Sequence, residues 1–300
     1  MQNNEQNKEQ NKASHNPMRQ ELRFEVQGQE MAAIAWGPSD GLPVLALHGW
    51  LDNAETFYQL APLLKGVRLI ALDMMGHGLT SHRPSSMPYY IWDNVSDLLT
   101  VADELELDQI HLLGHSMGAA VSSLVAGTFP DRVASLVLLE GLAPLVYDAL
   151  ELPEKMADAL RKRTRLRHRS PRYYSTMQEA VTARINGRFP VPEEAAERLV
   201  GRAIIKTEHG YHWRTDASVT LPSVVRLTEQ QVCAFLERIR CPSLLCLAEQ
   251  GIYPELTGTL ATRVQGIQTD LFPGTHHFHL EPEPVVPLAD RINRFYLSIG

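Results

Sequence analysis

A serine flanked by glycines is the first group in the sequence with a clear chemical use. The pattern Gly-His-Ser-Met-Gly occupies residues 114–118, after an apolar run that begins at Ile110 and before a stretch of small and apolar residues. Such a turn between a strand and a helix exposes the serine hydroxyl at a helix N-terminus, where free N–H groups favour developing negative charge. We therefore predict that Ser116 is a nucleophile. A nucleophilic serine also requires a base, an acid and donors for the oxyanion.

The segments that must position this serine alternate between strands and helices. Continuous apolar runs predict strands that are buried on both faces of a parallel sheet, and apolar residues at helical spacing predict helices between them. The expected strands are residues 22–26, 31–36, 43–47, 67–72, 110–113, 133–139, 243–247 and 268–272. The clearest expected helices are residues 95–105, 117–129, 193–205 and 284–297. This order predicts an α/β fold in which helices flank a mostly parallel sheet.

The chain divides into a tail, a core and an insertion. Residues 1–17 are polar and lack an apolar run, so we expect a disordered tail and no secretory signal. The alternation breaks between residues 142 and 240, which are mostly helical in pattern. An insertion after the sixth strand would lie over the carboxyl ends of the strands, where open α/β sheets bind ligands. We expect a core of residues 18–141 and 241–300, with a helical cap formed by residues 142–240.

Composition narrows the class of protein and of partner. The net charge of -7 argues against a nucleic-acid partner, because phosphate binding needs a basic surface. No segment has the length of apolar sequence that a membrane span needs. The three cysteines are odd in number and match no zinc spacing, which favours a reducing compartment. We expect a cytoplasmic protein that acts on a small molecule, and the sequence leaves the oligomeric state undetermined.

Two backbone amides are candidates for the oxyanion hole. One follows the nucleophile directly, at Met117. The other should come from the loop after the third expected strand, where the chain reads His48-Gly49-Trp50 and the glycine lets the backbone turn the next amide toward the site. We assign the donors to the N–H groups of Trp50 and Met117. Each such donor typically stabilises the transition state by about 3 kcal/mol.

Four motifs together resemble those of the α/β-hydrolases. They are His-Gly after a strand at residues 48–49, Asp-Met-Met-Gly-His-Gly at 73–78, the serine turn at 114–118, and His-x-x-His-Leu-Glu-Pro at 276–282. Two further segments, 210–216 and 226–231, resemble the serine hydrolase-like proteins of that superfamily. The resemblance implies an α/β-hydrolase fold with a helical cap after the sixth strand.

The resemblance also implies the base. In the superfamily the catalytic histidine is followed three residues later by a second histidine, and His276 with His279 fits that spacing. We assign the base to His276 and keep His277 as the alternative. Neighbouring histidines in one loop do not easily converge on an ion, so we expect no metal site. We expect no organic cofactor either, because the chain lacks a Gly-x-Gly-x-x-Gly after a strand and a P-loop.

The acid is missing from the position where the resemblance would put it. In most of the superfamily an aspartate follows the seventh strand, which is expected here at residues 243–247. This chain has Gly251 at that position. Three interpretations follow: the triad is broken, Glu249 serves from two residues earlier, or the acid has moved to Glu140 at the end of the sixth strand. We favour Glu140, because some haloalkane dehalogenases carry their acid there and because a carboxylate at the end of a buried strand needs a partner.

The identity of the nucleophile narrows the reaction. A serine attacks acyl groups through an acyl-serine, with water as the usual acceptor. We predict a serine hydrolase that cleaves a small carboxylic ester or thioester. The alternatives are a small-ligand receptor with slow or no turnover on a hydrolase fold, and a carbon–carbon bond hydrolase.

Overall fold

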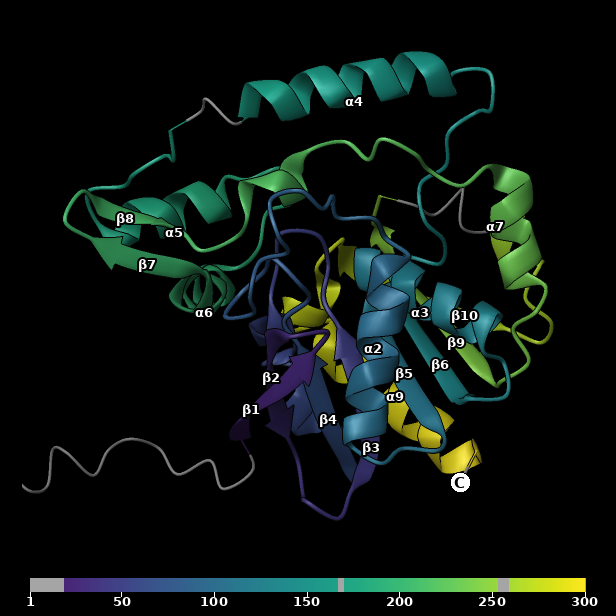
Figure 1. The fold of residues 1–300 in the computed structure, drawn as a ribbon. Coiled ribbons are helices and arrows are strands. Elements are labelled where there is room, and N and C mark those ends of the chain that lie inside the picture. Colours follow the sequence, from purple (N-terminus) through teal and green to yellow (C-terminus); the bar gives the residue numbers. More distant parts are fainter. Residues whose placement is uncertain (1–18, 167–169, 253–258, 300) are drawn as a thin grey trace, which may run out of the picture.

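An eight-stranded sheet runs through the protein, whose computed structural model describes residues 19–166, 170–252 and 259–299 (Figure 1). Its strands are β1 (Arg19–Val26), β2 (Gln29–Trp36), β3 (Leu42–Leu47), β4 (Val67–Leu72), β5 (Ile110–His115), β6 (Val133–Leu139), β9 (Ser243–Gln250) and β10 (Gln268–Thr275). The order across the sheet is β1-β2-β4-β3-β5-β6-β9-β10. β2 is antiparallel to both of its neighbours, and all the other pairs are parallel. This is the mostly parallel α/β sheet that the sequence predicts.

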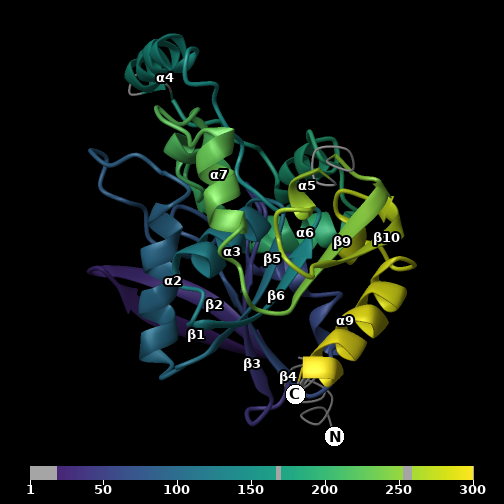
Figure 2. The same ribbon diagram turned by 90° about the vertical axis from the view of Figure 1, so that its right-hand side faces the viewer.

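Helices cover both faces of the sheet, which explains why the strands are continuously apolar. In β3, Val44 and Ala46 pack into one core cluster and Leu45 and Leu47 into the other. Figure 2 shows helix α9 (Val285–Ile299) on the side of the sheet away from α2 (Asp93–Glu104) and α3 (Met117–Thr128). Because successive strand residues point to opposite faces, burial on both faces favours apolar residues at most positions rather than at every second one.

The expected elements lie close to the observed ones, with one error. The predicted strands 67–72 and 133–139 have the bounds of β4 and β6. The predicted helix 193–205 is wrong at its end, because α6 (Glu193–Ala203) gives way to strand β7 (Ile204–Thr207), which pairs with β8 (Gly210–Trp213). The expected tail, residues 1–17, lies outside the described residues.

A long segment separates β6 from β9, where the insertion was expected. Its elements are α4 (Leu152–Leu166), α5 (Met177–Ile185), α6, β7, β8, η3 (Ala217–Thr220) and α7 (Glu229–Leu236). Figure 1 shows α4 above the sheet and α5, α6 and the β7–β8 hairpin to the left of its upper end, whereas α7 lies beside α3. Over the described parts of the chain, no helix combines the length and apolar character that a membrane crossing needs.

A buried ion pair joins this segment to the core. Arg202 of α6 donates through Nε to both carboxylate oxygens of Asp73, at 3.0 and 2.8 Å, and through Nη1 to Glu21 at 2.9 Å. Asp73 lies at the end of β4, and its oxygens also accept the backbone N–H groups of Ala54 and Leu79, both at 2.8 Å. The carboxylate is therefore buried with every oxygen satisfied, as a buried charge requires.

We predict that replacing Arg202 by methionine destabilises the protein. The Asp73 side chain is 0 % exposed, so the substitution leaves a buried charge without its counter-ion, at a cost of about 3 kcal/mol or more. Arg198→Met in the same helix is the matched control. Its partner Glu194 is exposed, so the loss should be about 1 kcal/mol or less. Urea unfolding measures both, and equal losses would contradict the prediction.

Candidate active site

The serine turn has the strained geometry that the motif predicts. Ser116 follows β5 with φ 51° and ψ −111°, and α3 begins at the next residue. Both flanking glycines are required by close backbone contacts. A Cβ at Gly114 would lie 2.4 Å from the carbonyl oxygen of Gly118, and one at Gly118 would lie 2.1 Å from that of Leu47. These distances are far below van der Waals contact, so the turn tolerates no side chain at either position.

Ser116 is hydrogen-bonded to His276, which follows β10. The Nε2 atom of His276 lies 3.0 Å from Oγ of Ser116, and its Nδ1 atom lies 3.2 Å from Oε2 of Glu140. An ionised carboxylate can only accept, so Nδ1 carries the proton and Nε2 is left to accept the serine proton. The structure thus brings together the three residues that the sequence analysis named, in the order serine, histidine, carboxylate.

The carboxylate of Glu140 is fully buried and held from three sides. Glu140 follows β6 with φ 49° and is 0 % exposed. Its Oε1 atom accepts the backbone N–H of Ala248 at 2.6 Å, and Oε2 accepts that of Ile252 at 3.1 Å as well as Nδ1–H of His276. These hydrogen bonds replace the contacts with water that a buried carboxylate loses.

Gly251 makes room for this carboxylate. A Cβ at Gly251 would lie 2.2 Å from Oε2 of Glu140. The position where the resemblance places an aspartate and the carboxylate of Glu140 therefore occupy the same space, and one excludes the other. Glu249, the alternative acid, is exposed.

The two predicted oxyanion donors lie on segments that touch. Met117 is the first residue of α3, where N–H groups have no partner within the helix. Gly118 packs against the carbonyl groups of Leu47 and His48, which brings the start of α3 against the end of β3. The next residues turn back sharply, with the N–H of Asp52 donating to Gly49 at 3.1 Å. This turn carries the N–H group of Trp50.

His48 supports that turn from within the core. Its Nδ1 atom donates to the carbonyl oxygen of Gly49 at 2.7 Å, and its Nε2 atom accepts the N–H of Met74 at 3.0 Å. Burial lowers the pKa of His48 to about 3, so the ring is neutral and structural.

A second group of side chains, formed by Asp52, Arg184 and His277, lies next to the group of Ser116, His276 and Glu140. The sequence analysis did not find this second group. Asp52 accepts Nη2–H of Arg184 in α5 at 2.7 Å and Nε2–H of His277 at 3.0 Å. Burial would raise the pKa of Asp52, but Arg184 and His277 together lower it well below its ordinary value. No local pattern marks this group, because its members come from three distant segments. Arg184 also donates to the carbonyl oxygen of Phe189 at 2.7 Å, and the Phe189 ring centroid lies 4.9 Å from that of His276.

Comparison with known proteins identifies the family that the sequence motifs resemble, the α/β-hydrolases. The family model described as "alpha/beta hydrolase fold" matches residues 43–218. A "serine hydrolase-like protein" of Dictyostelium discoideum is 33% identical over 85% of this chain and 75% of its own length, and one of Danio rerio is 30% identical over 88% and 85%. A solved structure, a hypothetical protein from Pseudomonas aeruginosa PAO1, is 41% identical with a TM-score of 0.88, over 93% of this chain and 99% of that one. The chain belongs to the α/β-hydrolase family.

We predict a steep acid destabilisation caused by buried histidines. Burial lowers the pKa of each of five rings near the site, which are His48, His77, His115, His277 and His279. The unfolded chain therefore binds more protons, and stability falls as the pH drops below the ordinary value of 6.5 toward the lower folded values. Each ring contributes up to about 1.4 kcal/mol per pH unit to this loss.

Urea unfolding between about pH 7 and pH 5 measures this slope. His279 Nε2 lies 3.0 Å from the hydroxyl of Thr56, a contact that glutamine can keep without titrating. His279→Gln should therefore give a shallower loss than the parent protein. Identical slopes in the two proteins would refute the contribution of this ring.

Proposed function

We propose that the protein is a serine hydrolase that cleaves a small carboxylic ester or thioester, with Ser116 as nucleophile, His276 as base and Glu140 as acid. The observation that supports this best is the continuous chain of hydrogen bonds from Oγ of Ser116 through His276 to a fully buried carboxylate. A receptor without turnover does not need a buried carboxylate aimed at the second ring nitrogen of a histidine that contacts the serine. The geometry therefore favours catalysis over the receptor.

In the first step Oγ of Ser116 attacks the substrate carbonyl while Nε2 of His276 takes the hydroxyl proton. Glu140 keeps the proton on Nδ1 and stabilises the imidazolium that forms. The N–H groups of Trp50 and Met117 donate to the oxyanion. His276 then protonates the leaving alcohol or thiol, which leaves an acyl-serine.

In the second step His276 takes a proton from water, which attacks the acyl-serine. The tetrahedral intermediate collapses with return of the proton to Oγ of Ser116, and the carboxylic acid leaves. The same constellation serves carbon–carbon bond hydrolysis when the leaving group is a stabilised carbanion, and a panel of substrates separates the two.

We further propose that residues 142–240 act as a cap over the core, residues 18–141 and 241–300. Three contacts support this role. Arg184 binds Asp52, the Phe189 ring packs on His276, and Nε1–H of Trp50 donates to Val219 at 2.9 Å. A segment that touches the base and the oxyanion loop is placed to select the substrate. All three cysteines are free, which supports the expected cytoplasmic location.

The nucleophile is tested with a fluorophosphonate probe and p-nitrophenyl butyrate. We expect labelling and turnover in the parent protein, and loss of both in Ser116→Ala. Ser96→Ala, at an exposed serine of α2, is the control and should retain both. His276→Ala should lower kcat by several orders of magnitude, while His277→Ala has a smaller effect. Labelling that survives in Ser116→Ala would overturn the assignment.

The acid is tested by neutralising it and then by moving it. Glu140→Gln keeps the shape and removes the charge, so we expect kcat to fall by about 10³ to 10⁴. Glu249→Gln should change kcat little, because Glu249 is exposed. Glu140→Ala vacates the space beside Gly251, so the double variant Glu140→Ala/Gly251→Asp should recover part of the activity that Glu140→Ala loses. Equal activities of Glu140→Gln and Glu249→Gln would contradict this assignment.

A further inference from the structure

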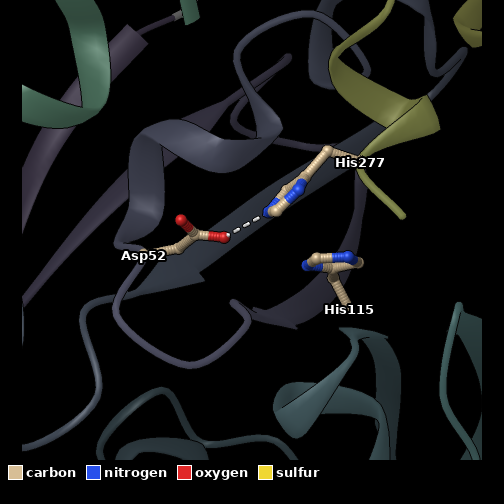
Figure 3. A group of neighbouring side chains, drawn as sticks. All are labelled: Asp52, His115 and His277. Atoms are coloured by element: carbon tan, nitrogen blue, oxygen red, sulfur yellow. Dashed lines mark hydrogen bonds and ion pairs between the residues drawn. The ribbon is translucent and has the colours of Figure 1, made fainter. Parts of the chain in front are cut away.

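Three buried side chains from distant segments converge in the core of the protein (Figure 3). They are Asp52 in the loop after β3, His115 at the end of β5 and His277 in the loop after β10. One potential ligand atom from each lies within 4.8 Å of the other two. The residues are 2, 0 and 3 % exposed. The sequence analysis dismissed a metal because adjacent histidines in one loop do not converge, but this group takes only one residue from that loop.

His115 has an unused lone pair directed at this group. Its Nε2 atom lies 2.9 Å from the carbonyl oxygen of His276. A carbonyl can only accept, so Nε2 carries the proton and Nδ1 is an unprotonated acceptor. Among the described residues, Nδ1 of His115 is buried without a hydrogen-bond partner. A Cβ at Gly49 would lie 2.8 Å from this atom and 3.4 Å from Oδ2 of Asp52, so only glycine leaves the two facing each other.

Asp52 and His277 already have the spacing of two ligands on one ion. Oδ2 of Asp52 lies 3.0 Å from Nε2 of His277, and two bonds of about 2.0–2.1 Å to one ion span such a separation. The other oxygen of Asp52 is held by Arg184 at 2.7 Å, which fixes the carboxylate. Metal-binding histidines usually donate their second N–H to a carbonyl or carboxylate, as His115 does here.

We propose that Oδ2 of Asp52, Nδ1 of His115 and Nε2 of His277 bind one divalent transition-metal ion, of which Zn²⁺ fits the ligands. Two imidazoles and a carboxylate are a common zinc set, whereas Mg²⁺ and Ca²⁺ prefer oxygen. On binding, the proton of His277 moves from Nε2 to Nδ1, so the ring stays neutral and the proton count is unchanged.

The ion would act as an inhibitor, a consequence that rests on the proposed function. The ligand atoms lie within 4.8 Å of one another, and two bonds of about 2.1 Å span at most about 4.2 Å, so an ion draws together any pair that exceeds this span. His276 is tied to this group at two points, through its bond to His277 in the chain and through the hydrogen bond from His115 to its carbonyl. Contraction of the group therefore shifts the base away from its position 3.0 Å from Ser116.

Binding is tested by titrating chelator-treated protein with Zn²⁺ against a chromophoric chelator. We expect one Zn²⁺ per chain and no comparable binding of Mg²⁺. His115→Gln keeps a donor for the carbonyl of His276 but lacks Nδ1, and Asp52→Asn loses the anionic oxygen. Each should weaken binding by about tenfold or more. His209→Gln, at an exposed histidine, is the control and should bind as the parent does.

X-ray absorption of the zinc-loaded parent protein provides a readout that does not depend on how the variants fold. It should show two imidazole ligands, and a shell of oxygen ligands alone would overturn the site. The site is also overturned if the parent protein binds no Zn²⁺, or if His209→Gln is the only variant that loses zinc binding. Inhibition is measured separately with p-nitrophenyl butyrate. Protein that binds zinc but shows no turnover in the metal-free state would count against the proposed hydrolase and leave the metal site standing, whereas metal-free turnover without zinc binding would do the reverse.

Discussion

The carboxylate of Glu140 is the constraint around which the site is arranged. A buried carboxylate needs hydrogen bonds in place of water, and here the amide of Ala248 in β9, the amide of Ile252 just after β9 and the His276 ring supply them. This requirement accounts for features that are otherwise unconnected. Glu140 takes a left-handed backbone conformation, Gly251 carries no side chain, and the chain at and after the end of β9 presents two amides to the carboxylate.

Much of the fold and of the site follows from local pattern. Strands buried on both faces are mostly apolar, so their runs stand out in the sequence, and a glycine-flanked serine between a strand and a helix marks its own location. Glu140 could be named because a carboxylate at the end of such a run needs a partner. The prediction that the helix continues to residue 205 was wrong. Ile204 and Ile205 continue the apolar spacing of α6, although the helix ends at Ala203. Their β-branched side chains instead pair with β8, a partner that helical periodicity cannot reveal.

The remaining features depend on long-range packing. Asp52 meets Arg184 across 132 positions and His277 across 225, and neither separation leaves a trace in local composition. Two buried ion pairs attach the segment after β6 to the core. Arg184 binds Asp52 in the loop after β3, and Arg202 binds Asp73 in the loop after β4. Buried ion pairs are directional and costly to break, so they fix the orientation of that segment more strictly than apolar contact would.

The backbone at Ser116 and Glu140 has one more consequence. Within the described chain, five residues other than glycine have a positive φ, and these two are among them, at the ends of adjacent strands. Each such conformation costs about 1–3 kcal/mol and persists only because the surrounding packing enforces it. Glycine at either position would relieve the strain and at the same time remove the side chain of the proposed nucleophile or of the proposed acid. At these two residues, thermal stability and the proposed catalysis therefore favour different amino acids. Selection for heat resistance alone would favour glycine at both positions and so remove the proposed site.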